Sequence, residues 1–350
     1  MHAKSLNQSN EFSLVNKFPN VLVCGTGSIG QRHIKNLQSL NVTVSAWRNR
    51  RELAEELSEK FGIIVHADLD CGLEQADAVV IATSTNTHID IALKAAKQGK
   101  AIYMEKPIAK SFSEIAPLVS EISKNNNIIE VGFQLRAHPN LVKIHEILRQ
   151  KPFGPLYTYR AVVGQRLDRW RPDTDYRECY SASIKYGGGA LLDLIHEIDL
   201  VHWLTGDIEK IYGNISHVSD LEMSTDDLAN LTLMNKNGSI GQIQMDMVSP
   251  NYRRGLELVY RDAVIYWDYM TGTIYKKKDG VQSLIDELPK TFEKNTMFIK
   301  LMRNFIERVN GEVKPPFCSL EDAIVAQKIA ESARTSSMLE RVVKLDEITL

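Results

Sequence analysis

The sequence predicts an α/β domain built on a parallel sheet, followed by an α+β domain with a large open, mainly antiparallel sheet. In residues 21–104, short apolar runs alternate with amphipathic segments of helical length, as in successive β-α-β crossover units. After residue 133, longer segments alternate apolar and polar residues with few helices between them. A chain of 350 residues suits two domains, because single hydrophobic cores rarely grow that large.

The elements of the first domain follow one another along the chain. Strands are predicted at 21–24, 42–46, 78–83, 101–104 and 128–133, and helices at 29–40, 51–61 and 88–99. In the second domain, strands are predicted at 156–166, 228–234 and 240–247, with Asn237-Gly238 as a hairpin turn. The domain boundaries expected from this pattern are a polar N-terminal tail at 1–18, an α/β domain at 19–133 and an α+β domain at 134–350.

The composition argues against several classes of protein. The 42 basic and 44 acidic residues give a net charge of -2, which provides no general attraction for nucleic acid or an anionic membrane. The four cysteines are scattered, the histidines show no metal-ligand spacing, and no apolar run reaches the length of a membrane helix. The N-terminus lacks the pattern of a secretory signal. We therefore expect a soluble, cytoplasmic protein without a metal, a nucleic-acid partner or a membrane partner.

A glycine-rich loop, Gly25-Thr26-Gly27-Ser28-Ile29-Gly30, lies between the first predicted strand and the first helix. In a Rossmann fold, the first glycine permits the tight turn, the second lets the backbone approach a pyrophosphate, and the third allows close packing of the helix. The N–H groups at Ser28 and Ile29 would then bind the phosphates. The motif predicts a dinucleotide site; the alternative is a glycine-rich turn without a ligand.

The end of the second strand bears on the choice of dinucleotide. An acidic residue about 20 positions after the glycines usually binds the ribose hydroxyls of NAD, whereas an arginine can accommodate the 2′-phosphate of NADP. Here the chain reads Trp47-Arg48-Asn49-Arg50-Arg51, without an acid. This favours NADP slightly over NAD, with Arg48 as the contact; the alternative is a solvated, basic start to the next helix.

Two further motifs identify a family. The segment Glu105-Lys106-Pro107 ends a predicted strand, and GGGALLDLIHEID at 187–199 leads into a predicted helix. Together with the glycine loop, in this order, they resemble the Gfo/Idh/MocA oxidoreductases, the family of glucose-fructose oxidoreductase and inositol dehydrogenase. The resemblance covers nearly the whole chain after the tail.

The resemblance implies catalytic roles for Lys106, His196 and Asp193. Lys106 and His196 would face the nicotinamide, with Lys106 binding the reacting hydroxyl and His196 acting as general acid or base, and Lys106-Pro107 would be a cis peptide. Helical spacing places Asp193, His196 and Asp199 on one stripe. Asp193 would orient the histidine or bind a neighbouring hydroxyl. Many members have Asp-x-x-x-His where this chain has one residue fewer, which leaves the role of Asp193 open.

The resemblance also implies further contacts to the cofactor and the substrate. Glu105 and Lys106 would contact the cofactor, as would the loop after the strand at 78–83, which contains Thr83, Ser84, Asn86 and His88; for His88 a packing role is the alternative. At the domain junction, Gln134, Arg136 and His138 match a segment that lines the substrate cleft in relatives, and Arg136 is the better candidate. With Lys106, Asp193 and His196, it forms the expected substrate site.

The loop at 166–186 adds two substrate candidates, Trp170 and Tyr176. It is rich in arginines and aromatic residues and has few acids, which suits a polar or phosphorylated sugar; a solvated loop or a subunit contact is the alternative. Its sequence resembles members associated with surface polysaccharide and nonulosonic acid synthesis, which points to an amino sugar or a nucleotide sugar.

The expected activity is reversible hydride transfer between NAD(P) and a secondary alcohol or ketone of a sugar, cyclitol or nucleotide sugar. Relatives often pair through the open sheet, so the resemblance implies a homodimer or homotetramer. Two alternatives stay open. One is reduction of a non-sugar substrate, such as a dihydrodiol or a linear tetrapyrrole, and the other is a dinucleotide-binding regulator without turnover.

Overall fold

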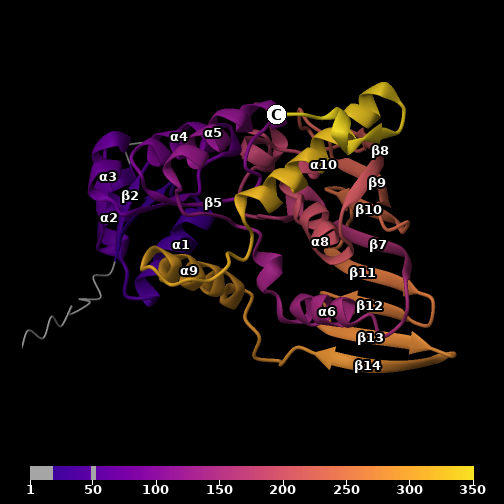
Figure 1. The fold of residues 1–350 in the computed structure, drawn as a ribbon. Coiled ribbons are helices and arrows are strands. Elements are labelled where there is room, and N and C mark those ends of the chain that lie inside the picture. Colours follow the sequence, from indigo (N-terminus) through magenta and orange to yellow (C-terminus); the bar gives the residue numbers. More distant parts are fainter. Residues whose placement is uncertain (1–18, 49–52) are drawn as a thin grey trace, which may run out of the picture.

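The computed structural model describes residues 19–48 and 53–350. The expected tail at 1–18 and the arginines Arg50 and Arg51 lie outside the described residues. Two β-sheets with their helices lie beside each other, the first near the N-terminus and the second formed by the later strands (Figure 1). Both predicted domain types are confirmed.

The first sheet has six parallel strands in the order β3-β2-β1-β4-β5-β6, the order typical of a Rossmann fold. Its strands are β1 (Asn20–Cys24), β2 (Thr43–Trp47), β3 (Ile64–His66), β4 (Ala78–Ile81), β5 (Ala101–Met104) and β6 (Ile129–Val131). The helices between them are α1 (Ser28–Ser39), α2 (Ala54–Phe61), α3 (Leu69–Gln75), α4 (His88–Lys97) and α5 (Ala116–Asn125).

Both faces of this sheet are buried, which explains its continuous apolar strands. Along β1, Leu22 and Cys24 belong to the hydrophobic cluster that includes α4 and α5, whereas Val21 and Val23 belong to the cluster on the other face. A strand buried on both sides has no polar positions to alternate with apolar ones.

The second sheet has nine strands in the order β14-β13-β12-β11-β7-β10-β9-β8-β15. Its neighbours are antiparallel except for β7 and β10, which pair in parallel. The strands are β7 (Leu156–Gly164), β8 (Ile208–Ser216), β9 (Leu228–Asn235), β10 (Ile240–Asp246), β11 (Arg253–Tyr260), β12 (Val264–Asp268), β13 (Thr273–Lys278), β14 (Val281–Glu287) and β15 (Val343–Lys344).

The predicted hairpin between β9 and β10 is present, but its turn uses only one residue with a positive φ. Gly238 has φ +86°. Asn237 instead accepts hydrogen bonds through its side-chain oxygen from the backbone N–H (3.0 Å) and the hydroxyl (2.7 Å) of Ser239. An asparagine side chain that bonds the backbone two residues on can form such a turn without a positive φ.

Helices lie on one side of the second sheet, namely α6 (Pro139–Gln150), α8 (His196–Thr205) and α10 (Leu320–Leu339) (Figure 1). The approach of α10 to β8 is close, because a Cβ on Gly213 would overlap the carbonyl oxygen of Ala333. None of the described helices is long and apolar enough to cross a lipid bilayer.

Helix α9 (Asn295–Val309) comes from the segment expected in the second domain, yet it packs on the first sheet beside α1. Its buried residues Met297, Leu301 and Phe305 share a hydrophobic cluster with residues of β1, β2, β4 and β5. We did not predict this helix, although its apolar residues recur at helical spacing. Sequence order alone does not indicate that a late helix returns to an early sheet.

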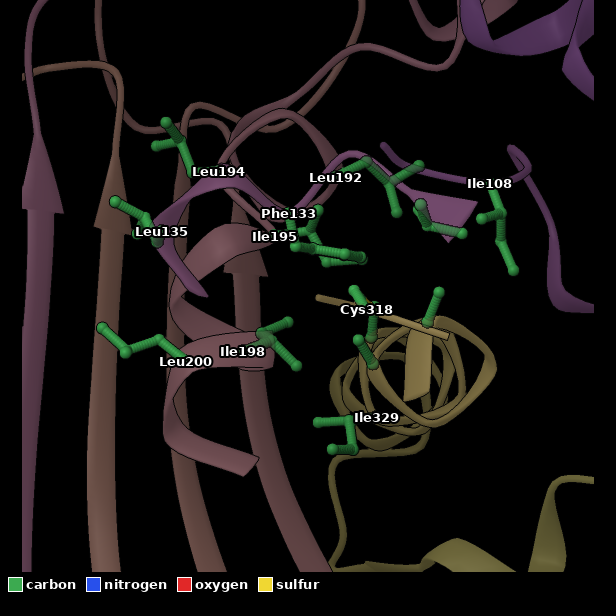
Figure 2. Close-up of a cluster of buried hydrophobic side chains, with 14 of the residues drawn as sticks. Ile108, Phe133, Leu135, Leu192, Leu194, Ile195, Ile198, Leu200, Cys318 and Ile329 are labelled. Atoms are coloured by element: carbon green, nitrogen blue, oxygen red, sulfur yellow. The ribbon is translucent and has the colours of Figure 1, made fainter. Parts of the chain in front are cut away.

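A core at the domain junction connects the two parts of the chain. Figure 2 shows Phe133 beside Ile195, with Ile198 of α8 facing Cys318 and the α10 side chain Ile329. All five side chains are buried in the same cluster as the strands of both sheets. The two domains therefore share a continuous apolar core.

A buried ion pair holds α9 to the first sheet. The Arg308 guanidinium donates to the Glu130 carboxylate (3.1 Å), which also accepts from the Phe317 backbone N–H (3.2 Å). Burial raises the pKa of Glu130 to about 7. We expect Arg308→Leu to lower the free energy of unfolding by about 2 kcal/mol, because it leaves a buried carboxyl group without its cation. Urea unfolding measures the loss.

The matched control is the double substitution Glu130→Leu with Arg308→Leu, which removes both members of the pair. It should recover most of the lost stability, since replacing a whole buried pair with apolar residues is often neutral. A double variant as unstable as the single one would contradict this role of the pair.

Candidate active site

The glycine loop between β1 and α1 leaves open space at one position and is tightly packed at two others. Gly25 has φ +94°, and a Cβ there would lie 2.6 Å from the Ala82 carbonyl oxygen. A Cβ on Gly30 would overlap the carbonyl oxygen of Gly25, whereas a Cβ on Gly27 would meet nothing within 4 Å. The fold itself therefore requires the first and third glycines, and the second leaves room for a ligand to approach the backbone.

The first turn of α1 presents backbone donors at this open space. The first hydrogen bond of the helix runs from the Gln31 N–H to the Gly27 carbonyl oxygen (2.9 Å), so the N–H groups of Ser28 and Ile29 have no partner within the helix. No acidic residue lies in this turn. The arrangement fits the pyrophosphate of a dinucleotide, an anion that helix N-termini bind.

Arg48 follows β2 directly, at the edge of the sheet where β1 ends. Its Nη1 donates weakly to the Leu53 carbonyl oxygen (3.4 Å). Among the described residues, its buried Nε has no hydrogen-bond partner. Arg48 is therefore held near the position of the adenosine ribose in a Rossmann fold.

Thr83, Ser84 and Asn86 lie in the loop after β4, against the glycine loop. The Ser84 hydroxyl donates to the Asn86 side-chain oxygen (2.7 Å), and the Thr83 hydroxyl accepts from Thr87 (2.8 Å). These bonds keep the three residues at the same edge of the sheet as the glycine loop.

His88, at the start of α4, connects two loops. Its Nδ1 faces the Pro107 carbonyl oxygen (2.9 Å) and its Nε2 faces that of Thr83 (3.1 Å). Burial lowers the pKa of His88, so its ring is neutral and can donate to one of the two oxygens. These contacts match the packing role that the sequence left open.

Glu105 also faces the protein interior. Its Oε1 lies 2.8 Å from Nε2 of His33, and both side chains are buried. The pair connects the end of β5 to α1 and so fixes the phosphate-facing helix relative to the next residue, Lys106. The sequence did not single out His33.

Lys106 reaches from the first domain to the second. Its Nζ donates to the Asp193 carbonyl oxygen (2.6 Å) and lies 3.4 Å from the carboxylate oxygen Oδ1 of the same residue. The Lys106-Pro107 peptide is cis, as the resemblance implied. Lys106 and Asp193, 87 positions apart, are thus brought together at the domain junction.

Asp193 is fully engaged by neighbours other than His196. Its Oδ1 accepts from the Tyr180 hydroxyl (2.6 Å) and its Oδ2 from the Ser181 hydroxyl (2.5 Å). Burial and the Asp193 charge raise the pKa of Tyr180 well above its usual value, so its proton stays in place to donate. The geometry makes Asp193 an anchor for Lys106. The sequence analysis did not single out Tyr180 within the loop at 166–186.

The predicted single helix after Gly189 is wrong. The structure has one helical turn, α7 (Ala190–Asp193), followed by α8, which starts at His196. Between the two helices, the Ile195 N–H donates to the carbonyl oxygen of Leu192, three residues back (3.4 Å), and not to the residue four back as in an α-helix. Because of this break, a helical wheel does not describe the directions of Asp193 and His196.

His196 is the buried titratable group beside Lys106. Its Nδ1 is shielded and has no hydrogen-bond partner among the described residues, and Phe133 lies edge-on to the ring with centroids 5.6 Å apart. Burial, together with the positive charges of Lys106 and Arg254, lowers the pKa of His196 well below its usual value. The imidazole is therefore neutral near pH 7 and can accept a proton.

A second buried pair, which we did not predict, lies next to the histidine. Arg254 of β11 donates from Nε (2.6 Å) and Nη2 (3.0 Å) to the two carboxylate oxygens of Glu197. Burial raises the pKa of Glu197, and the arginine opposes that shift. A buried acid on a helix needs a partner. That rule could have flagged Glu197, but it could not have named Arg254.

The structure does not support Arg136 as a substrate residue. Its guanidinium is buried and donates to both oxygens of Asp199 (2.7–3.2 Å), to Asp322 (2.8 Å) and to the Phe317 carbonyl oxygen (3.2 Å). It joins the start of α10 to α8. Three nitrogens in good bonds leave little capacity for a ligand.

In the folded structure, acidic side chains neutralise part of the positive charge of the loop at 166–186. Arg166 pairs with Asp168 and Asp220 (both 2.9 Å), and Arg177 pairs with Asp175 (2.7 Å). The expected substrate residues are also engaged: the Trp170 indole donates to the Gln165 carbonyl oxygen (2.8 Å) and the Tyr176 hydroxyl accepts from the Glu222 N–H (3.0 Å). Two of the acids, Asp220 and Glu222, come from a segment that we did not connect with the loop.

A cavity of about 820 Å³ opens between α1, the start of α9 and the junction residues Gln134 and Leu135. It extends from Ser28, in the first turn of α1, to Arg254. Lys106 and His196 do not line it, but Arg254 is close enough to His196 to lower its pKa. In the part of the chain that the structure describes, no group of three His, Cys, Asp or Glu side chains is placed to hold a metal.

Two family models match the chain. Residues 19–133 match the oxidoreductase family with an NAD-binding Rossmann fold, and residues 141–266 match the GFO/IDH/MocA C-terminal domain. The chain is 26% identical to myo-inositol 2-dehydrogenase of Thermotoga maritima, covering 93% of this chain and 98% of that protein. It is 22% identical to UDP-N-acetylglucosamine 3-dehydrogenase of Acidithiobacillus ferrooxidans, covering 89% and 94%.

A solved structure supports the same fold. Levoglucosan dehydrogenase in complex with NADH superposes with a TM-score of 0.82 at 19% identity, covering 94% of this chain and 99% of that one. Both family models fall on the two domains whose geometry is described above, and the Rossmann cradle and the Lys106 motif lie within the first. The chain therefore belongs to the Gfo/Idh/MocA family of NAD-binding oxidoreductases.

Proposed function

We propose that this protein catalyses reversible hydride transfer between a nicotinamide dinucleotide and a secondary alcohol or ketone of a sugar, cyclitol or nucleotide sugar. One observation carries the proposal. Lys106 of the Rossmann domain donates a hydrogen bond to Asp193 of the second domain, and its charge lies near enough to His196 to lower the pKa of that residue. Relatives named as dehydrogenases of an inositol and of a UDP-sugar support the substrate class.

The proposed roles follow from the neutral imidazole of His196 and from the hydrogen bond that holds Lys106. Oxidised NAD(P), when bound, supplies the nicotinamide C4 that accepts the hydride from the carbinol carbon. The hydroxyl proton passes to His196, which is neutral and whose Nε2 is the ring nitrogen left for it, since Nδ1 is shielded. Lys106 donates a hydrogen bond to the reacting oxygen, and Asp193 keeps the ammonium in place. In the reverse direction, His196 returns the proton to the carbonyl oxygen.

We propose NADP as the slightly preferred dinucleotide, with Arg48 beside the 2′-phosphate. The absence of an acid at residues 47 and 48 supports this choice. The structurally similar levoglucosan dehydrogenase was solved with NADH, which favours NAD. The ratio of kcat/KM with the two dinucleotides decides between them.

We also propose assembly into a homodimer or homotetramer through the second sheet. Helices lie on one side of it (Figure 1), and the residues of a hollow over β7–β10, such as Arg160, Tyr212 and Gln242, are mostly polar or amphipathic. Light scattering after size-exclusion chromatography gives the oligomeric state. A monomer at micromolar concentration would contradict this part of the proposal.

The two glycines Gly27 and Gly30 should respond differently to the same substitution. We expect Gly27→Ala to leave the melting temperature unchanged and to weaken NADH binding at least tenfold, because its Cβ enters only the space left for phosphates. Gly30→Ala, the matched control, should lower the melting temperature because its Cβ overlaps the Gly25 carbonyl oxygen. Calorimetry and NADH fluorescence measure both. Unchanged NADH affinity in Gly27→Ala would contradict the cradle.

Replacing the catalytic candidates should abolish turnover but not dinucleotide binding. We expect Lys106→Ala and His196→Ala each to lower kcat by at least 100-fold, the scale of lost proton-transfer catalysis, on any alcohol that the wild type oxidises. The assay follows nicotinamide absorbance with NAD and NADP against inositols, aldoses, amino sugars and UDP-sugars. Dinucleotide binding without turnover on any of these would favour a regulatory protein.

The pH dependence should report the lowered pKa of His196. Alcohol oxidation needs the neutral imidazole, so kcat/KM should stay level as the pH falls from 8 to about 6.5, the usual histidine value, and decline only below it. Carbonyl reduction needs the protonated ring and should rise over the same acid range. An acidic limb above pH 6.5, or one that persists in the residual activity of His196→Asn, would contradict this role.

A further inference from the structure

The cavity between α1 and α9 is strongly basic. Four cationic side chains line it, Arg32, Lys35, Arg254 and Lys294, and no acidic side chain does. Glu197 neutralises Arg254, so the excess positive charge comes from the other three residues. We call this space, as defined by the four cations, the basic cavity.

The three remaining cations have no acidic partner among the described residues. The Arg32 guanidinium lies 4.7 Å from the centre of the Phe298 ring, and the Lys294 ammonium lies 5.0 Å from that of Tyr269. Neither contact neutralises charge. By contrast, several exposed arginines of this chain have a carboxylate within 3 Å, as Arg177 and Arg341 do.

These cations come from distant parts of the chain and are exposed, but the two helices that carry them are joined to each other. Arg32 and Lys35 lie one turn apart on α1, and Lys294 directly precedes α9. Reciprocal amide hydrogen bonds between Asn36 and Asn295 (2.8 and 3.3 Å) join the two helices beside the cavity. The cluster is therefore built by tertiary packing and is more than a solvated face of one helix.

The basic cavity adjoins the proposed reaction centre. Ser28, at one side, belongs to the first turn of α1, where the phosphates of the dinucleotide fit. Arg254, at the other, lies near His196. A substrate with its carbinol carbon at His196 could therefore extend into a space that favours negative charge.

We propose that the basic cavity binds an anionic group of the substrate. The inference rests on the proposed dehydrogenase function and narrows its substrate to a sugar that carries a carboxylate or a phosphate, in place of a neutral cyclitol. The three unpaired cations stabilise the negative charge through charge-assisted hydrogen bonds. Discrimination against neutral sugars follows, because a neutral sugar gains no such attraction.

The test compares sugars that differ in the anionic group attached to the ring. Initial rates are measured with glucose, glucuronate and glucose 6-phosphate. We expect higher kcat/KM for the two charged sugars than for glucose. Preference for glucuronate assigns the cavity to a carboxylate, and preference for glucose 6-phosphate assigns it to a phosphate. Equal or better turnover of glucose would overturn the proposal and leave the dehydrogenase function intact.

Variants establish where the charge is bound. Arg32→Gln and Lys294→Gln should each raise KM for the anionic sugar about tenfold, the scale of one charged hydrogen bond, with NADH affinity and melting temperature unchanged. Arg303→Gln, an exposed cation of α9 outside the cavity, is the matched control and should change nothing. Weaker dinucleotide binding in the two variants would assign the cations to the cofactor and overturn the proposal.

Equilibrium binding separates this inference from the proposed function. If no sugar is turned over, glucuronate and inorganic phosphate are titrated calorimetrically into the protein with NADH bound. If Lys294→Gln weakens this binding and Arg303→Gln does not, the anion site is supported. That result would hold even with the dehydrogenase assignment disproved. Absent binding, or binding equal in both variants, would overturn the site.

Discussion

The structure of the site depends on the hydrogen bonds that Asp193 makes across the domain junction. Lys106 leaves the first sheet beside a cis peptide bond and donates to the backbone oxygen of Asp193. The carboxylate of Asp193 is fixed in turn by the hydroxyls of Tyr180 and Ser181. A buried ammonium that lacked such partners would be costly. With them, the charge can be kept beside His196, where it helps to hold the imidazole neutral.

The other buried charges of the molecule follow the same rule, and each connects elements that are distant in sequence. Arg136 joins Asp199 to Asp322, Arg254 is paired with Glu197, and Arg308 with Glu130. The three unpaired cations of the basic cavity differ from this pattern, and they lie at a space large enough for a ligand. Those three cations are exposed, so what distinguishes them is their place together around one cavity that no acidic side chain lines.

Local backbone requirements explain which site residues could be predicted from the sequence. The roles of Gly25 and Gly30 follow from what a Cβ would meet, and the position of Lys106 follows from its place after a strand. The predictions that Arg136 and the loop at 166–186 bind substrate assumed that their cations have no acidic partners. Their acidic partners, such as Asp199 and Asp220, come from other segments, and no local pattern pairs them.

The sequence by itself determined the two fold types, the parallel and the mainly antiparallel sheet and the glycine loop, because hydrophobic periodicity and glycine motifs are local properties of the chain. Its motifs also identified the family. Only the tertiary structure decided the break between α7 and α8, the return of α9 to the first sheet, and the partners of Lys106, Arg136 and Arg254. Those features arise from packing and from the need to satisfy buried charges, which depend on residues far apart in the chain.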